Sequence, residues 1–343
     1  MGNGDAGLDL EHREAADALR KQALALPGPV SELVRLLKRK PLQVVVVCAR
    51  GSSGHAATFA KHLIERHVGI PVAPAAPSIV TLYSGQLRLH GQLFLAISQS
   101  GQSDDIVEYA MMAKRAGAIT AAIVNDTRSP VAACCDLVLP IDAGSELSVA
   151  ATKTFVGALG VLLRLVAAWT KDRMMANALD ELPDRVMAAT SLDWSAAERV
   201  FAASESLATI GRGPTLAIAR EAALKLKEIG NVHAEAFSGA EFLHGPVSLV
   251  DTRFPLLLFI PGDAAAGGMR ALAADLRQKG ASVWTTEAGD PARGQLPILP
   301  PRHPDVDAVC LIQSFYALAI RVAKSRGIDI ERPRHLQKVT RTR

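Results

Sequence analysis

Apolar and polar residues follow one another along this chain in blocks that predict strands and helices in turn. Residues 42–48 form a continuous and largely β-branched run, which is typical of a strand buried on both faces of a parallel sheet. Residues 93–97 form a second apolar run, and residues 104–115 have the pattern of a helix. Because strands that alternate with helices of about 10–15 residues form βαβ units, the sequence predicts an α/β fold.

The same pattern extends through the first half of the chain. The expected strands are 42–48, 79–82, 93–97, 118–124 and 137–141. The expected helices are 55–67, 104–115 and 148–170, after two helices within residues 9–40 that Pro27-Gly28-Pro29 separates. This order indicates a mostly parallel sheet flanked by helices, in the flavodoxin-like, doubly wound arrangement.

The strand pattern recurs in the second half at a constant offset. Arg212 lies 162 residues after Arg50, and the apolar run 256–260 stands at the same offset from 94–98. A repeat of this kind indicates that one fold occurs twice. The expected organisation is N-terminal helices at 1–40, a first domain at 41–170, a helical connector at 171–200, a second domain at 201–330 and a C-terminal tail at 331–343.

Composition narrows the class of protein. The chain of 343 residues is 49% apolar and 21% charged with a formal charge of +4, which fits an ordinary globular protein. An aromatic content of 4% argues against a nucleic-acid partner, since single-strand binding surfaces combine aromatic with basic residues. The four cysteines lack metal-binding spacing, which favours a reduced compartment. Neither a long apolar run nor a signal peptide is seen, so we expect a cytoplasmic protein with no membrane partner.

A dense group of hydrogen-bonding side chains follows the apolar run 93–97. Its members are Ser98, Gln99, Ser100 and Ser103, with Gly101 among them. Ligands bind at the carboxyl ends of parallel strands, where a helix N-terminus offers free backbone N–H groups to an anion. At the equivalent place in the second half, Pro261–Ala266, the hydroxyls are missing. The turn therefore does not need them as architecture, and we predict a phosphate site.

Other interpretations of this turn remain. Ser103 could cap the following helix while the other serines are solvated, because serine is a favoured N-cap. The dinucleotide pattern GxGxxG, the P-loop pattern GxxxxGK[ST] and the nucleophile-elbow pattern GxSxG do not match the turn. A second turn of this type, Gly51-Ser52-Ser53-Gly54, is expected to close the strand at 42–48.

Lys225 and Glu228 are three residues apart on a helix that we expect to end at Ile229, with Gly230 as the residue that stops it. The two side chains therefore share one face of the helix. A pair with this spacing is most often a surface salt bridge, and that interpretation stays open beside a catalytic one.

A short helix is expected after this one, because Ser238-Gly239-Ala240-Glu241 is a capping box and Gly245-Pro246 ends the segment. His244 would lie in its last turn, as a catalyst or as a packing or capping residue. The nearby histidines and glutamates lack the HExxH spacing of a zinc site, so we expect no metal.

These stretches closely resemble the isomerase half of glucosamine-6-phosphate synthase, which consists of two tandem sugar isomerase (SIS) domains. The matching stretches are ISQSGQS at 97–103, AGSELSVAATKTF at 143–155, AREAALKLKEIGNVHAEAFSGAEFLHGP at 219–246 and RPRHLQKVT at 332–340. They fall in the family's order and cover about residues 10–343. Among stand-alone tandem SIS proteins, the sequence is most similar to the second type of glucosamine-6-phosphate deaminase.

The resemblance implies a phosphosugar clasp in the first domain. The residues that match the clasp are Ser53, Ser98, Gln99, Ser100 and Ser103. Val149 matches a backbone contact to the sugar. Ala151 stands where the synthase has a sugar-contacting serine, so recognition of the sugar hydroxyls can differ.

The resemblance also implies the acid–base residues. Glu228 matches the base that moves a proton between C1 and C2, and Lys225 matches the lysine beside the charged intermediate. His244 matches a ring-opening histidine that reaches the neighbouring subunit's site, which implies a homodimer with shared active sites. Lys338 matches a tail lysine that helps to open the sugar and can form an imine with a ketose.

The implied reaction converts glucosamine 6-phosphate to fructose 6-phosphate and ammonia, without a metal or redox cofactor. The synthase has an N-terminal glutaminase domain that begins with a catalytic cysteine, and no such cysteine stands before the first strand here, so the deaminating direction is expected. Galactosamine 6-phosphate deamination, cleavage of a fructosamine 6-phosphate adduct and ammonia-dependent synthesis are enzymatic alternatives. A phosphosugar sensor without catalysis is the alternative from another class.

Overall fold

The computed structural model describes residues 7–338, and the contacts within it divide the chain into two compact units. Of the described residues, the N-unit comprises Glu14–Glu146, Lys153–Pro183 and residues 337–338, and the C-unit comprises residues 7–13, Leu147–Thr152 and Asp184–Leu336. Helix α9 (Arg173–Thr190) contains Pro183, where the chain passes from one unit to the other. The end of the predicted tail, residues 339–343, lies outside the described residues.

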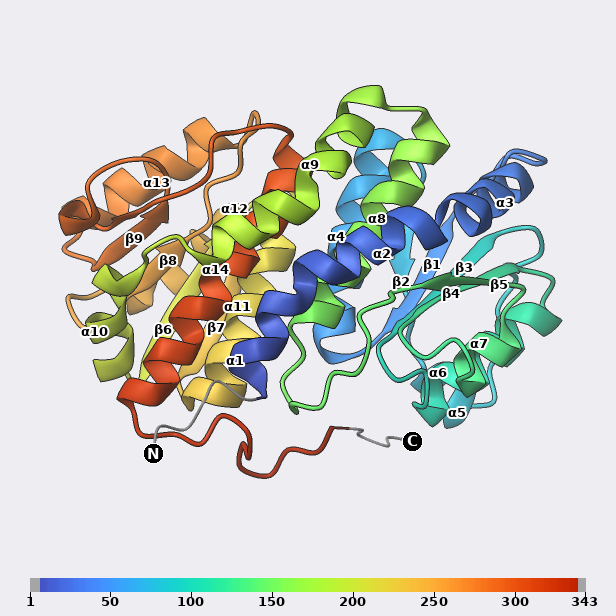
Figure 1. The fold of residues 1–343 in the computed structure, drawn as a ribbon, viewed down its shortest axis with the longest axis horizontal. Helices are drawn as coiled ribbons and strands as arrows, with labels where there is room; N and C mark the ends of the chain where they lie inside the picture. Colours follow the sequence, from blue (N-terminus) through green and yellow to red (C-terminus); the bar gives the residue numbers. More distant parts are fainter. Residues whose placement is uncertain (1–6, 339–343) are drawn as a thin grey trace. The chain divides into compact units, whose positions relative to one another are not determined.

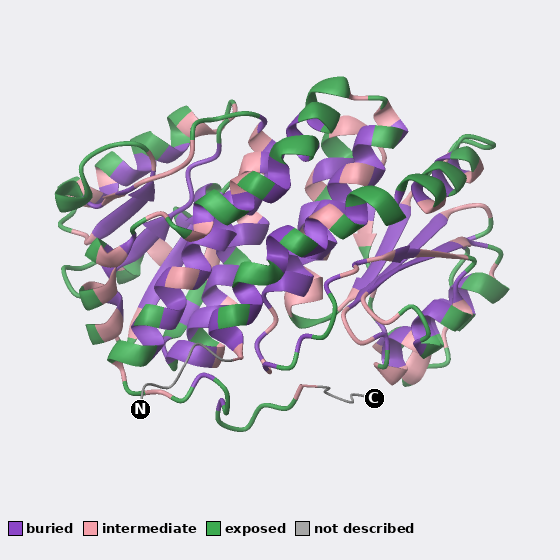
Figure 2. Ribbon diagram, in the orientation of Figure 1, coloured by how far each residue is buried: buried purple, intermediate pink, exposed green. Residues whose placement is uncertain are grey.

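The N-unit is built on a five-stranded parallel sheet of order β2-β1-β3-β4-β5 (Figure 1). Its strands are β1 (Val45–Ala49), β2 (Val72–Pro74), β3 (Leu93–Ser98), β4 (Ile119–Val124) and β5 (Leu137–Pro140). This is the flavodoxin-like strand order that the sequence predicted. The central strand β3 is buried along its whole length, as its continuous apolar run requires (Figure 2).

Helices cover both faces of this sheet, as the doubly wound pattern requires. They are α2 (Ala15–Ala25), α3 (Pro27–Leu37), α4 (Gly51–His67), α5 (Ser78–Thr81), α6 (Asp104–Arg115), α7 (Pro130–Cys134) and α8 (Lys153–Thr170). The expected break between the two N-terminal helices is present, with Pro27 at the start of the second one, where its missing N–H is tolerated.

The C-unit repeats this sheet with the order β10-β9-β8-β6-β7. Its strands are β6 (Ser206–Gly211), β7 (His233–Ser238), β8 (Leu256–Leu258), β9 (Val283–Thr286) and β10 (Gln295–Leu296). Val46 pairs with Phe94 in the N-unit, and Ala208 pairs with Leu256 in the C-unit, 162 residues later. The internal repeat predicted from the sequence is therefore confirmed down to the strand register.

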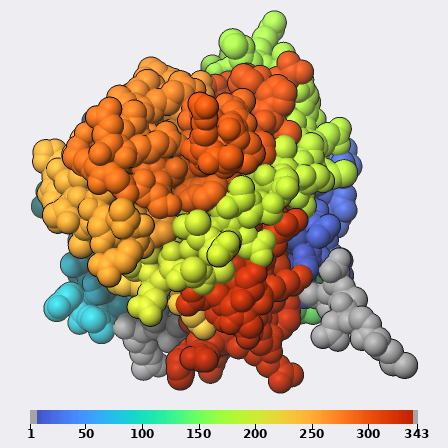
Figure 3. Space-filling view, turned by 90° about the vertical axis from the view of Figure 1, so that its left-hand side faces the viewer, coloured from blue at the N-terminus to red at the C-terminus, as the bar shows by residue number. Residues whose placement is uncertain are grey.

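The helices of the C-unit vary widely in length. They are α1 (Leu8–Glu11), α10 (Ser195–Ala203), α11 (Thr215–Gly230), α12 (Gly239–Phe242), α13 (Ala266–Gln278) and α14 (Pro304–Ser325), with 3-10 turns at His12–Glu14, Pro246–Leu249 and Pro291–Arg293. Figure 3 looks onto this unit, where a yellow-green band that includes α10 borders the orange surface that includes α13 and the red surface that includes α14.

Helices α8 and α14 are long and apolar enough to span a membrane by length and composition alone. In each, 83% of the apolar window is buried inside the protein. Burial of this extent is what the core helix of an α/β unit requires, so packing accounts for their composition.

Two predicted elements are wrong. Residues 79–82 do not form a strand, because α5 occupies Ser78–Thr81 and the edge strand is β2. Pro74 ends β2, which is allowed at a sheet edge, and it hid this strand from the periodicity. The helix expected at 148–170 starts at Lys153, because residues 147–152 pack in the C-unit instead.

Candidate active site

The clasp residues gather at one point of the N-unit sheet. In the sheet, β2 lies on one side of β1 and β3 lies on the other, so the direction in which strands are added reverses between β1 and β3. In a parallel sheet this reversal opens a crevice outside the carboxyl ends of the two strands, where ligands bind. Ser53 follows β1, and Ser98, Gln99, Ser100 and Ser103 follow or end β3.

The predicted turn Gly51–Gly54 is wrong as a turn, because α4 begins at Gly51. Arg50 is the extended residue before the helix, and Gly51 itself has a φ of 53°. Ser53 therefore lies in the first helical turn, where backbone N–H groups have no partner within the helix. This placement keeps Ser53 close after the carboxyl end of β1 and adds a helix N-terminus there.

The loop after β3 is held by its own hydroxyls. Ser98 Oγ accepts a hydrogen bond from the Gly101 N–H at 3.0 Å, and Ser100 Oγ accepts one from the Gln102 N–H at 3.3 Å. The backbone oxygen of Gln99 accepts from the Asn125 N–H at 3.1 Å. A hydroxyl that accepts in this way still has its own hydrogen to donate, so both serines can serve an anion while they shape the loop.

Ser103 and Gly101 have separate roles in this loop. Ser103 occupies the N-cap position of α6, but its side chain makes no capping hydrogen bond, so the interpretation that it merely caps the helix is not supported. Gly101 has a φ of 62°, and a Cβ there would lie 2.1 Å from Ser129 Oγ. Glycine is thus required by the fold at this position.

Arg50 and Asp105 join the two turns. The Nε and Nη2 groups of Arg50 donate to Asp105 Oδ2 at 3.0 and 2.8 Å. Asp105 is buried in the first turn of α6, and Arg50 precedes α4. The guanidinium therefore offsets the aspartate charge at the start of α6.

The C-unit uses the residue equivalent to Ser53 for internal hydrogen bonds. Thr215 stands 162 residues after Ser53, is fully buried, and has its Oγ1 at 2.8 Å from the Phe259 carbonyl oxygen. Its Oγ1 also accepts from the Arg212 N–H at 3.0 Å. The hydroxyl of the second copy is therefore bonded within the protein, whereas Ser53 of the first copy is only half-buried.

Helix α11 carries Lys225 between two carboxylates. Lys225 is fully buried, its Nζ donates to Glu228 Oε2, and it lies 3.4 Å from Glu221 Oε1. Tyr316 of α14 donates to Glu221 Oε1 at 3.4 Å. The alternative of a surface salt bridge is therefore wrong. Glu221 was not singled out from the sequence, although its i−4 spacing from Lys225 was a usable signal.

Glu228 is the member of this group that reaches the surface. Its side chain is 20% exposed, whereas those of Glu221 and Lys225 are 0% exposed. A buried ammonium beside a partly exposed carboxylate can stabilise negative charge while the carboxylate moves a proton. The helix ends one residue later than predicted, since Gly230 is still helical and Asn231 takes the left-handed conformation with a φ of 47°.

The capping box is confirmed on the serine side, because Ser238 Oγ accepts from the Glu241 N–H at 3.2 Å. The placement of His244 in the last helical turn is wrong. α12 ends at Phe242, and His244 lies exposed in the turn that follows, because the positive φ of Gly245 breaks the helix early.

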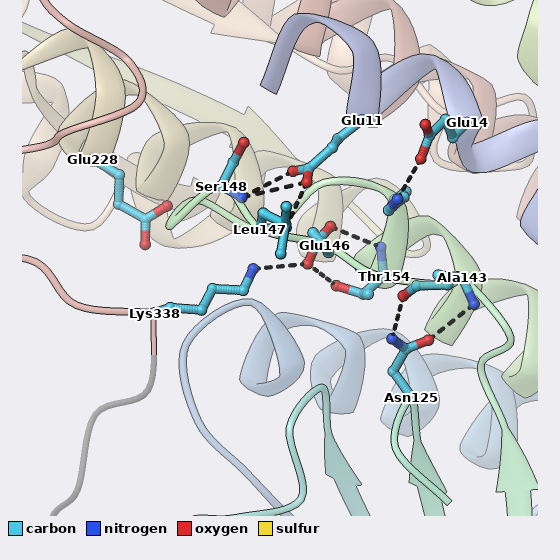
Figure 4. Close-up of polar contacts among 12 residues, drawn as sticks. Glu11, Glu14, Asn125, Ala143, Glu146, Leu147, Ser148, Thr154, Glu228 and Lys338 are labelled. Carbon is cyan, nitrogen blue, oxygen red and sulfur yellow. Dashed lines mark hydrogen bonds and ion pairs between the residues drawn. The ribbon is translucent and has the colours of Figure 1, made fainter. Parts of the chain in front are cut away.

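Val149 lies half-buried in a loop of the C-unit that Glu11 holds. The backbone N–H of Leu147 donates to Glu11 Oε1, and that of Ser148 donates to Oε2 at 3.1 Å (Figure 4). In the N-unit, Lys338 Nζ lies 3.2 Å from Oε2 of the buried Glu146 (Figure 4). Neither glutamate was singled out from the sequence, because both contacts join residues more than 100 positions apart.

Two kinds of reactive group were considered besides these residues: clusters of metal ligands and cysteine thiols. Among residues 7–338, no three histidine, cysteine or carboxylate side chains cluster closely enough to hold a metal ion. Burial raises the pKa of the Cys48, Cys135 and Cys310 thiols to about 12, so these three remain protonated at neutral pH.

Comparison with known proteins agrees with this arrangement. The chain is 32% identical over 334 residues to the glutamine–fructose-6-phosphate aminotransferase (isomerizing) of Zymomonas mobilis, covering 92% of this chain and 54% of the relative, so it spans about half of that protein. The structure matches a candidate phosphosugar isomerase of Silicibacter pomeroyi DSS-3 with a TM-score of 0.90 at 40% identity, covering 94% of this chain and 99% of the other.

A third match is the C-terminal domain of the Francisella tularensis glucosamine-fructose-6-phosphate aminotransferase, with a TM-score of 0.86 at 26% identity, covering 96% of this chain and 99% of that domain. The SIS domain matches residues 41–168 and again residues 201–285, one match on each parallel sheet. The resemblance drawn from the sequence is confirmed, and the chain belongs to the SIS domain family.

Proposed function

We propose that this protein is a phosphosugar isomerase that converts glucosamine 6-phosphate to fructose 6-phosphate and ammonia. The observation that carries the proposal is the buried ammonium of Lys225, held against the partly exposed carboxylate of Glu228. Isomerisation between C1 and C2 needs a base that takes one proton and returns it, next to a cation that stabilises the charged intermediate. The two side chains form such a pair.

The clasp supports a phosphorylated substrate. Hydroxyls at the carboxyl ends of β1 and β3, together with the N-termini of α4 and α6, suit a phosphate better than a neutral sugar. Binding the phosphate would hold the remote end of the sugar, so that binding energy serves to orient C1 and C2.

In the proposed reaction, His244 protonates the ring oxygen, the C1 hydroxyl gives up its proton to water, and the sugar opens to its aldehyde. Glu228 takes the proton from C2 and returns it to C1, while Lys225 stabilises the negative charge that develops on O1. The product carries a hydroxyl at C1 and an imine at C2. Water adds to that imine, ammonia leaves, and fructose 6-phosphate remains. Lys338 supplies an amine that assists ring opening.

The deaminating direction is part of the proposal. It consumes only the amino-sugar phosphate and water, whereas synthesis of glucosamine 6-phosphate also needs a source of ammonia. The same residues would serve both directions, because a catalyst lowers one barrier for forward and reverse reactions alike.

The test is ammonia release from purified protein with glucosamine 6-phosphate, compared with Glu228→Gln. We expect turnover by the wild type and a loss of about 100- to 10,000-fold in the variant. Glu241→Gln is the matched control, because Glu241 is an exposed glutamate of the same unit. Equal rates for the wild type and Glu228→Gln would disprove the role of Glu228.

A substrate panel separates the enzymatic alternatives. Galactosamine 6-phosphate and a fructosamine 6-phosphate adduct test the specificity that Ala151 leaves open. Amination of fructose 6-phosphate at high ammonium tests the reverse direction. Tight binding of the phosphosugars without any turnover would instead favour a sensor.

A further inference from the structure

Glu146 is a buried carboxylate at the N-terminus of α8. Its side chain is 0% exposed, and it accepts hydrogen bonds from the Thr154 N–H at 3.2 Å and the Thr154 hydroxyl at 2.6 Å (Figure 4). Thr154 is the second residue of the helix, so the carboxylate lies where the helix dipole favours a negative charge. Each oxygen of the carboxyl group thus accepts one hydrogen bond at the start of the helix.

Capping alone does not explain this carboxylate. A serine or asparagine satisfies the first N–H groups of a helix without bringing a charge into the interior. A buried charge is destabilising unless a countercharge lies close to it. The countercharge here is Lys338, whose Nζ lies 3.2 Å from Glu146 Oε2 with the lysine side chain 24% exposed.

The partner lysine comes from a segment without regular structure. Residues 328–338 form neither helix nor strand, so their position depends on side-chain contacts. Glu331 Oε2 accepts from the Ser148 hydroxyl at 3.2 Å, and Glu331 Oε1 accepts from the Leu8 N–H at 2.8 Å. Glu146 and Ser148 are two residues apart, so one short stretch of chain contacts the tail at Glu331 and again at Lys338.

We propose that Glu146 is a positioning residue for Lys338, fixing the tail amine in place through a buried ion pair. Its part in turnover rests on the proposed function, in which Lys338 assists ring opening. Its part in holding the amine does not, because the ion pair is a property of the folded chain. The two claims can therefore be tested separately.

The first test measures the reactivity of Lys338 without substrate. Wild type and Glu146→Gln are treated with a trace of an amine-acylating ester, and acylation at Lys338 is measured by mass spectrometry relative to the exposed Lys21 of α2. The substituted amide keeps an oxygen for the Thr154 N–H, and it replaces the oxygen that faces the Thr154 hydroxyl and Lys338 with an uncharged NH2 group. We expect acylation of Lys338 to rise about fivefold in the variant, and an unchanged rate would overturn the proposal.

Thr154→Val is the matched control, since it weakens the cap of α8 but keeps the charge of Glu146. It should lower the melting temperature and leave the acylation of Lys338 unchanged. If acylation rises as much as in Glu146→Gln, loosening of the helix end explains the effect and the proposal fails.

The second test is kinetic. In Glu146→Gln, kcat for ammonia release should fall about 10- to 100-fold with KM changed less than about threefold, because a misplaced group slows the chemical step more than binding. Faster acylation with normal kcat would overturn the catalytic part. Faster acylation with no ammonia release by any variant, wild type included, would overturn the proposed function and support the ion pair.

A further variant covers the case in which Glu146→Gln does not fold. Lys338→Met removes the cation and leaves the carboxylate buried, so its melting temperature should fall by several degrees. An unchanged melting temperature would show that Glu146 does not depend on Lys338, and would overturn the proposal.

Discussion

Thr215 Oγ1 lies 2.8 Å from the carbonyl oxygen of Phe259, joining the turns after β6 and β8 in the interior of the C-unit. Ser53 is the equivalent residue of the N-unit and is only half-buried. Thr215→Val should lower the free energy of unfolding by about 1–3 kcal/mol, because it leaves buried backbone groups without a partner. Ser53→Ala should change it by less than about 0.5 kcal/mol.

In a binding experiment we expect the opposite ranking of the two variants. Ser53→Ala should weaken phosphosugar binding, and Thr215→Val should leave it unchanged under conditions in which the protein is folded. Urea denaturation and isothermal titration measure the two effects. If Ser53→Ala bound with wild-type affinity, Ser53 would not belong to the clasp.

Gly101→Ala tests the backbone of the clasp loop. The substitution places a Cβ 2.1 Å from Ser129 Oγ and forces alanine into a φ of 62°. Since a left-handed alanine costs about 1–2 kcal/mol before any clash, stability and phosphosugar affinity should both fall.

Gly91→Ala is the control that introduces backbone strain without pushing the loop after β3 out of place. Gly91 also has a positive φ, of 71°, but a Cβ there meets no atom within 4 Å. It should lose stability from strain alone and keep its affinity. Equal losses of affinity in both variants would mean that the position of the loop after β3 does not matter.

Lys225→Met removes the cation between Glu221 and Glu228. Glu221 is fully buried, so its charge then lacks the nearest compensating group, and the variant should lose about 3–5 kcal/mol of stability. Adding Glu221→Gln should recover part of that stability without restoring activity. Chemical denaturation with a parallel ammonia assay checks both expectations, and no recovery in the double variant would contradict the charge argument.

His12 should make the C-unit sensitive to acid. Burial lowers the pKa of its imidazole below the ordinary value of 6.5, and this outweighs the hydrogen bond to the Leu8 carbonyl oxygen, which acts in the opposite direction. The native state therefore keeps His12 neutral while the unfolded chain takes up a proton near pH 6.5.

Stability should consequently fall as the pH drops below about 6.5, by up to about 1.4 kcal/mol per pH unit, until the native pKa is reached. Melting temperatures between about pH 8 and pH 5 measure this slope. The slope should flatten in His12→Gln and persist in a variant of the exposed His233. A slope unaffected by His12→Gln would assign the effect to other groups.

The shared active site can be tested by complementation. If His244 completes the site of a partner subunit, a mixture of Glu228→Gln and His244→Ala chains should recover about a quarter of wild-type activity after random exchange, because half of the dimers then carry one intact site. Verified heterodimers without activity would show that each chain supplies its own histidine.

Much of the fold could be predicted from the sequence because its signals are local. The apolar runs ending at Ala49 and Ser98 gave central strands, and the 162-residue offset gave the repeat and its register. The loss of hydroxyls at Pro261–Ala266 pointed to a ligand in the first copy before any geometry was known. The edge strand β2 could not be predicted, since a three-residue strand that ends in proline is too short to show an alternation of apolar and polar residues.

The contacts of the candidate site residues could not be predicted from the sequence. Lys225 and Glu228 could be paired by helical spacing, but only packing showed that Lys225 is buried and that Tyr316 and Glu221 share its surroundings. The observed ends of helices such as α12 differ from the predicted ends by a residue or two, because caps depend on the conformation of single residues such as Gly245.

The sequence by itself determined two copies of a doubly wound fold, a hydroxyl-rich turn and a lysine–glutamate pair on one helix, since each is set by spacing along the chain. Only the tertiary structure decided that Glu146 meets Lys338 and that Glu11 holds the loop of Val149. Those contacts join residues 192 and 136 positions apart, and their energy depends on burial and distance, which no local pattern encodes.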